Sequence, residues 1–114
     1  MSRKETTIQI QVGLDENQIP EKITWSAPDG GVESQDSKAM FLSMWDADQQ
    51  ETLRMDLWVK DMPVDQMQVF FHQVLTGMKE SYYRATNDDK MAGSFQDFCD
   101  YFAEKLELKK VRKS

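Results

Sequence analysis

The sequence predicts an α+β fold, with a four-stranded antiparallel sheet followed by two helices packed on one face of that sheet. In most of the first 60 residues apolar and polar side chains alternate, which is the period of a strand with one wet face. After Pro63 the apolar residues recur every three to four positions, which is the period of an amphipathic helix. Since each element must bury its apolar side, strands followed by helices favour two packed layers.

The first two strands are expected to form a hairpin. Residues 6–14 and 20–27 both alternate apolar with polar side chains, and the polar residues 15–18 between them supply turn chemistry. The breaker cluster at residues 28–31, which contains two glycines, ends the second strand. The polar stretch from there to Ser37 is interpreted as a loop.

The third and fourth strands are expected to form a second hairpin. Residues 39–45 are apolar at nearly every position, so a strand is preferred for residues 34–45 but a helix is the alternative. The fourth strand, at residues 52–60, alternates clearly. If the loop between these two strands has an even number of residues, such as 47–50, the pairing of the strands determines which side chains share a face. This pairing places Met40, Leu42, Met44, Leu53, Met55 and Leu57 on the side that faces the helices. It places Phe41, Trp45, Thr52, Arg54, Asp56 and Trp58 on the opposite side.

Two helices are predicted between residues 63 and 108. Pro63 suits a first helical turn, and the first helix is expected to end near Ala85. Residues 87–89, Asn-Asp-Asp, offer a turn and an N-cap for the second helix. The two helices and the fourth strand are expected to form one buried cluster. Its predicted members are Phe71, Val74, Met78, Phe98, Phe102, Met55 and Leu57.

Length and charge exclude several classes of protein. The 114 residues suffice for one domain, with a sheet at 6–60, a helical pair at 63–108 and a basic tail at 109–114. The net charge of -6 and the pI near 4.7 make binding to nucleic acid improbable. No run approaches the roughly 20 apolar residues of a membrane span, and no signal-peptide pattern is present. A cytoplasmic protein without membrane insertion is therefore expected.

The residues that could carry chemistry are few. His72 and Cys99 are the sole histidine and cysteine, and no second His or Cys stands at metal-ligand spacing from His72. A thiol enzyme would require Cys99 and His72 to meet beside an electropositive pocket, which the acidic composition disfavours. We therefore expect no catalytic residues, no metal, no cofactor and no enzyme activity.

One predicted surface suggests protein binding. The expected outer face of the second hairpin carries two tryptophans and a phenylalanine where a wet strand face would normally be polar. The alternative interpretation is that these aromatic side chains are covered by the loop at residues 28–37 or by the aliphatic part of the Arg54 side chain. The predicted protein-binding residues are Phe41, Trp45, Arg54, Asp56 and Trp58.

Several strings in the chain resemble the gliding motility protein GldC family. The strings lie in the second hairpin and in both predicted helices, and the early residues 20–23 and 27–31 also fit. They are Trp45-Asp46, Thr52-Leu53-Arg54-Met55-Asp56-Leu57-Trp58, Lys60-Asp61-Met62-Pro63-Val64-Asp65, Phe70-Phe71-His72-Gln73, Arg84-Ala85-Thr86 and Asp97-Phe98-Cys99-Asp100-Tyr101-Phe102.

The resemblance implies a cytoplasmic accessory protein of gliding motility, as found in gliding Bacteroidetes and their relatives. It implies protein partners in the gliding and type IX secretion apparatus, and no catalytic residue carries over from the family. A second copy of the chain, in a homo-oligomer, is a further candidate partner. The order of strands and then helices on a small acidic chain is also that of SecB-like export chaperones. The alternative function is therefore a holdase for unfolded secretory chains.

Overall fold

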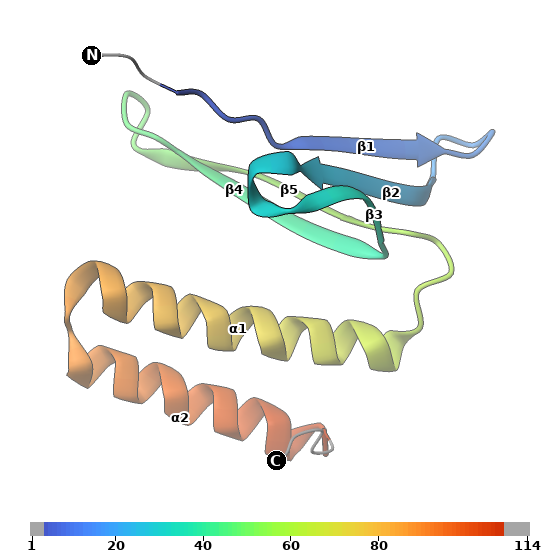
Figure 1. The fold of residues 1–114 in the computed structure, drawn as a ribbon. Helices are drawn as coiled ribbons and strands as arrows, with labels where there is room; N and C mark the ends of the chain where they lie inside the picture. The colour runs from blue at the N-terminus through green and yellow to red at the C-terminus, as the bar shows by residue number, and fades with distance from the viewer. Residues whose placement is uncertain (1–3, 109–114) are drawn as a thin grey trace. The chain divides into compact units, whose positions relative to one another are not determined.

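A computed structural model describes residues 4–108 of the chain (Figure 1). The chain divides into two compact units, one up to Met62 that holds the strands and one from Pro63 that holds two helices. The predicted α+β order is therefore confirmed. The prediction of one four-stranded sheet is wrong, because residues 4–108 form five strands, in one sheet of three and one of two. The packing of the helices on a sheet face and the single domain stay predictions, and the basic tail at 109–114 lies outside the described residues.

The three-stranded sheet is antiparallel in the order β1 (Gln9–Leu14), β2 (Pro20–Ala27) and β3 (Val32–Ser37). The predicted first hairpin is confirmed, since Val12 pairs with Ile23 across β1 and β2. Its turn is held by the Asp15 carboxylate, which accepts the Asn17 and Ile19 N–H groups at 2.8 and 3.0 Å. Ile23 is only 1% exposed and is a core residue of this unit.

Strand β3 replaces most of the predicted loop. A short 3₁₀ helix (Pro28–Gly30) follows β2, and Gly31, at φ 80°, has the left-handed conformation that glycine adopts readily. The chain then returns along β2, although residues 33–37 are polar. The Ser34 N–H donates to Ser26 Oγ at 2.8 Å where the register of the two strands shifts. Because this strand has polar side chains on both faces, apolar and polar residues do not alternate along it. The pattern by which a strand is predicted from sequence is therefore missing here.

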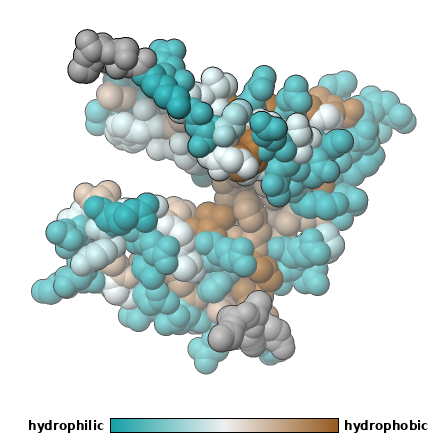
Figure 2. All heavy atoms as spheres, viewed as in Figure 1, coloured by the Kyte–Doolittle hydropathy of each residue, from teal (hydrophilic) through white to brown (hydrophobic). Residues whose placement is uncertain are grey.

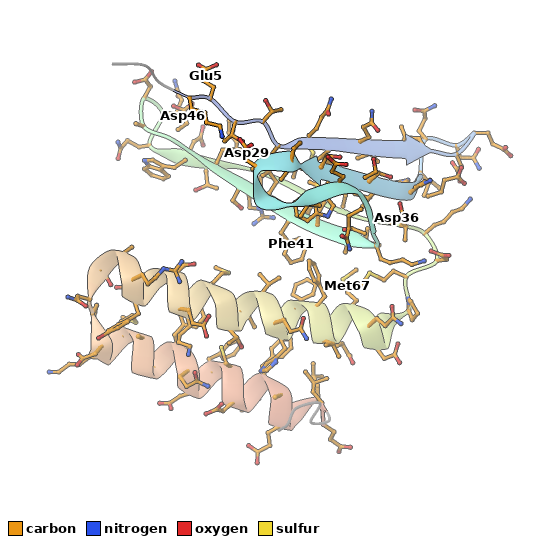
Figure 3. All side chains as sticks on the ribbon, viewed as in Figure 1. Glu5, Asp29, Asp36, Phe41, Asp46 and Met67 are labelled. Carbon is orange, nitrogen blue, oxygen red and sulfur yellow. The ribbon has the colours of Figure 1, made fainter. Side chains whose placement is uncertain are left out.

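The second sheet is the antiparallel hairpin of β4 (Ala39–Asp46) and β5 (Glu51–Trp58). The preference for a strand over a helix at residues 34–45 is confirmed, although these residues belong to two strands, β3 and β4. Only Lys38 separates β3 from β4, so two nearly continuous strands belong to different sheets. The turn begins at Asp46, whose carboxylate accepts the Asp48 N–H at 3.0 Å (Figure 3).

The end of β5 is tied to β2 and to the segment before β4. The Val59 N–H donates to the Lys38 carbonyl at 2.8 Å, and the Lys60 N–H donates to the Pro20 carbonyl at 3.0 Å. The Lys60 ammonium also donates to the Asp15 carboxylate at 2.9 Å. This bond lowers the pKa of Asp15 and raises that of Lys60. Val59 is buried at this junction.

The second unit is a pair of helices, α1 (Val64–Thr86) and α2 (Asp89–Lys105). Asn87 ends α1 in the left-handed conformation, and its N–H donates to the Tyr83 carbonyl at 2.8 Å. Asp88 is the N-cap of α2, because its Oδ1 accepts the Met91 N–H at 3.0 Å. The two predicted helices and the predicted cap are therefore confirmed.

Four of the seven residues predicted to form one buried cluster are exposed instead. Phe71, Met78, Phe98 and Met55 are between 41% and 53% exposed. In the helical unit the buried residues are instead the small side chains Ala92 and Cys99 on α2. The contact between the helices that the structure shows is made by His72 on α1 with Cys99 and Phe102 on α2.

Candidate protein-binding face

The five residues predicted to bind protein lie on one face of the β4–β5 hairpin. The register pairs Phe41 with Asp56, Ala39 with Trp58, Ser43 with Arg54, and Trp45 with Thr52. Directly paired residues project to the same side of an antiparallel sheet. The predicted alternation of β4 and β5 is therefore confirmed, and we call this side the aromatic face. It comprises Ala39, Phe41, Ser43, Trp45, Thr52, Arg54, Asp56 and Trp58.

The two tryptophans of the aromatic face are exposed and lie far apart on it. Trp45 is 63% exposed and Trp58 is 50% exposed, so neither the Arg54 stem nor residues 28–37 cover them. Trp45 pairs with Thr52, six residues before Trp58 on β5, which separates the two positions by roughly 20 Å at about 3.3 Å per residue. The face therefore offers two separate aromatic contacts rather than one continuous patch.

An ion pair lies between the two tryptophans. Arg54 Nη2 donates to Asp56 Oδ2 at 2.9 Å, and these residues are two apart on β5, so they share the face. The Arg54 side chain is largely exposed, and an exposed pair of this kind contributes little to stability. It does keep the middle of the face neutral and rich in hydrogen-bonding groups. Phe41, opposite Asp56, is half-buried.

The opposite face of the same hairpin is also apolar. It is formed by three directly paired couples, Met40 with Leu57, Leu42 with Met55, and Met44 with Leu53. Met44, Leu53 and Met55 are each more than half exposed. One layer of helices can cover only one face of a sheet. A hairpin with two apolar faces therefore presents more apolar surface than one helical layer can bury.

His72 and Cys99 meet, but through the backbone of α2. The His72 Nε2 atom lies 3.1 Å from the Cys99 carbonyl oxygen, and the Phe102 ring stacks on the imidazole with centroids 6.1 Å apart. The Cys99 thiol is buried. Within residues 4–108, His, Cys, Asp and Glu side chains form no group of three that could hold a metal ion. The contact that the structure shows is a link between two helices.

Sequence reasoning missed a groove between the two helices near their connection. It is open, with a volume of about 530 Å³, and both helices contribute charged side chains to its walls. The lining residues are Lys79, Glu80, Tyr83, Arg84, Asp89, Ala92, Gly93 and Gln96. Two of these residues are basic and two are acidic, so the groove favours no one sign of charge.

Comparison with known proteins gives one match. The family model described as gliding motility-associated protein GldC-like matches residues 20–108, which is well over half of the chain. The chain belongs to the GldC-like family. In this GldC-like chain the match runs from the start of β2 past the end of α2, so it includes the whole aromatic face and leaves out β1. Curated proteins and solved structures gave no match. Neither described helix is long and apolar enough to cross a membrane.

Proposed function

We propose that this GldC-like chain is a non-enzymatic, cytoplasmic accessory protein of gliding motility that acts by binding another protein through its aromatic face. The association with gliding motility rests on the family, and the binding mechanism rests on the face. The observation that carries the mechanism is the exposure of Trp45 and Trp58 on one side of a single hairpin. Tryptophan and arginine are the residues most enriched among those that dominate binding energy at interfaces.

The arrangement of the face supports binding of a protein surface rather than a small molecule. A small-molecule site is a concave pocket that encloses most of its ligand. The aromatic face is the side of a hairpin, and its two exposed rings are separated by roughly 20 Å along β5. Anchors at that spacing suit a partner with two apolar recesses and polar groups between them that pair with Arg54 and Asp56.

The proposed partners are proteins of the gliding and type IX secretion apparatus. The test is affinity capture from a lysate of a gliding bacterium with the full chain as bait. We expect the double variant W45A/W58A to lose the specific partners, because removing an interface anchor costs binding more than stability. Far-ultraviolet circular dichroism and a thermal melt should show that this variant still folds.

The matched control changes the other face of the same hairpin. Leu53→Ala and Met55→Ala remove exposed apolar side chains of similar accessibility from the same hairpin. Capture of all partners by W45A/W58A would refute the proposal. Loss of partners from the Leu53 and Met55 variants alone would move the contact to the opposite face.

A holdase for unfolded secretory chains is the second candidate function. The observation that favours it is the apolar surface on both faces of the hairpin, since such a chaperone needs extended apolar surface. A holdase would suppress the aggregation of an unfolded client at micromolar concentration. An unchanged rate of client aggregation, measured by light scattering, would dismiss this candidate.

A further inference from the structure

The hydrogen bonds of the β4–β5 hairpin determine which backbone groups of β5 point outward. The Val59 N–H donates to the Lys38 carbonyl at 2.8 Å, which continues the register of the hairpin by one pair. Along an antiparallel hairpin, hydrogen-bonded pairs alternate with pairs whose N–H and C=O groups point away from the neighbouring strand. Counting back from Val59, every second residue of β5 therefore points these groups outward. The outward residues of β5 are Thr52, Arg54, Asp56 and Trp58.

The outer edge of β5 has no strand beside it within residues 4–108. In this part of the chain β5 pairs with β4 alone, and no other backbone group bonds to residues 52–58. Just beyond them the Lys60 N–H donates to the Pro20 carbonyl, which marks the end of the open edge. The four residues that point outward are exposed. The backbone edge at residues 52–58 is therefore accessible to another strand.

β5 lacks two features that commonly protect an edge strand. Edge strands are often protected from further pairing by a proline or a bulge. β5 contains no proline, and its register with β4 is regular, whereas the β1–β2 and β2–β3 pairs each shift register once. A sheet of only two strands is also at most marginally stable by itself. The hairpin would therefore gain from an added strand.

The order of charges on β5 indicates which strand fits this edge. Figure 2 shows apolar residues at the surface of the strand unit in several places between hydrophilic ones, so apolar exposure alone selects no partner. Along β5, however, Arg54 and Asp56 lie symmetrically about Met55, with a leucine next to each on the far side or between them and the ends: the sequence Leu-Arg-Met-Asp-Leu spans residues 53–57. Read in the reverse direction, this sequence keeps its apolar residues and exchanges its two charges.

Two β5 strands therefore match each other when they are antiparallel and centred on Met55. Arg54 of each copy then lies opposite the second copy's Asp56, and opposite charges at directly paired positions are favourable. The outward residues of one copy face the outward residues of the other, so their backbone groups can also bond. A shift by one residue would mismatch those backbone groups. A shift by two residues would place Arg54 opposite Arg54 or Asp56 opposite Asp56.

We propose that a second copy of this chain adds its β5 to the outer edge of β5, antiparallel and centred on Met55, so that two hairpins form one four-stranded sheet. Main-chain hydrogen bonds supply the affinity of such a strand addition, and side-chain pairs determine its register. The same edge on both copies makes a closed two-fold contact. The contact uses the edge of the hairpin, so it does not depend on the proposed binding of another protein by the aromatic face.

The first test is a disulfide that reports the register. In the proposed dimer Met55 faces its own copy in a pair without hydrogen bonds, the closer kind, with Cβ atoms about 4.5 Å apart. We expect M55C to give a covalent dimer of twice 13.3 kDa on oxidation, seen by non-reducing electrophoresis of the full chain. Leu53→Cys is the matched control, because Leu53 is also more than half exposed but faces Leu57 in this register. It should cross-link roughly tenfold more slowly.

The second test exchanges the charges and measures the dimer by sedimentation equilibrium over a range of concentrations. We expect R54D to raise the dissociation constant of the dimer about tenfold, because two acidic side chains then face each other in each of two pairs. D56R should weaken the dimer similarly by placing two basic side chains together. The double variant R54D/D56R re-forms both pairs with their charges exchanged and should recover the affinity of the unmodified chain.

Three outcomes would overturn this proposal. One is a strict monomer at every concentration, which would leave the edge to a strand of a different protein or to none. The second is a dimer that neither R54D nor D56R weakens, which would place the contact elsewhere. The third is cross-linking of L53C as fast as that of M55C, which would exclude the register centred on Met55. If a charge variant is unfolded by circular dichroism, the comparison of M55C with L53C decides the question.

Discussion

The His72 Nε2 atom and the Cys99 carbonyl oxygen lie 3.1 Å apart, which joins the middle of α1 to the middle of α2. A carbonyl oxygen can only accept a hydrogen bond, so the imidazole donates from Nε2. Phe102, one turn further along α2, stacks on the same ring. The histidine therefore holds the two helices together through a polar contact and an aromatic contact at once.

Replacing His72 with alanine should destabilise the helical unit without affecting partner capture. The lost hydrogen bond and the lost stacking together should cost about 1–3 kcal/mol of unfolding free energy. Urea unfolding followed at 222 nm measures that loss, and His72→Gln, which keeps an amide donor, should recover part of it. Loss of a cellular function with unchanged stability would instead indicate a chemical role for the imidazole.

The Cys99 thiol should react slowly in the folded protein. Its side chain is fully buried between the helices, and a thiolate must reach the reagent to be modified. Labelling with a chromogenic disulfide reagent should be at least a hundredfold slower in buffer than in denaturant. His72→Ala removes the contact that covers this side of α2 and should accelerate labelling of the native chain. Val69→Ala, a change elsewhere on α1, is the control and should accelerate labelling less. Rapid labelling of the native chain would contradict the closed contact between the helices.

The Asp88 cap should make stability fall in acid. The Met91 N–H and the Tyr82 hydroxyl both donate to this carboxylate and hold its pKa below the usual 3.8. Because the folded-state pKa is depressed, the contribution is complete above pH 3.8 and is lost as the pH falls through the folded value. Asp88→Ala should lower the melting temperature at pH 7 and flatten its decline in acid. Asp88→Asn keeps a capping oxygen and should lower the melting temperature less.

Truncation of Ile23 should cost far more stability than truncation of Trp45. Ile23 is 1% exposed, so Ile23→Ala should cost about 2–5 kcal/mol through the lost contacts and the cavity left behind. Trp45→Ala removes a largely exposed side chain and should change the melting temperature little. Phe71→Ala should fall between them because Phe71 is 41% exposed. Thermal melts of the three variants compare them directly, and equal losses at Ile23 and Trp45 would mean that the tryptophan is covered in solution.

Much of the local structure followed from the sequence because its causes are local. The side-chain period of two and an even turn were enough to place Leu42 and Met55 on one face and Trp45 and Trp58 on the other. The start of α1 followed from the proline at position 63, although Pro63 lies just before the helix and not in its first turn. The Asn-Asp turn marked the end of α1 and the start of α2, because Asn87 and Asp88 satisfy backbone groups of those two termini. The family match covers these same elements.

The structure alone decided which residues are buried and where the sheet divides. Strand β3 is stabilised by pairing with β2, so its polar residues 33–37 carried no periodic signal of their own. The division at Lys38 assigns two adjacent strands to different partners, which depends on contacts across the chain. Likewise, the period of each helix predicted a broad apolar sector. The contact of His72 with Cys99 and Phe102, with Phe98 left exposed, depended on how the two helices approach each other. Periodicity identifies the apolar sector of an element, but burial is settled by the surface that packs against it.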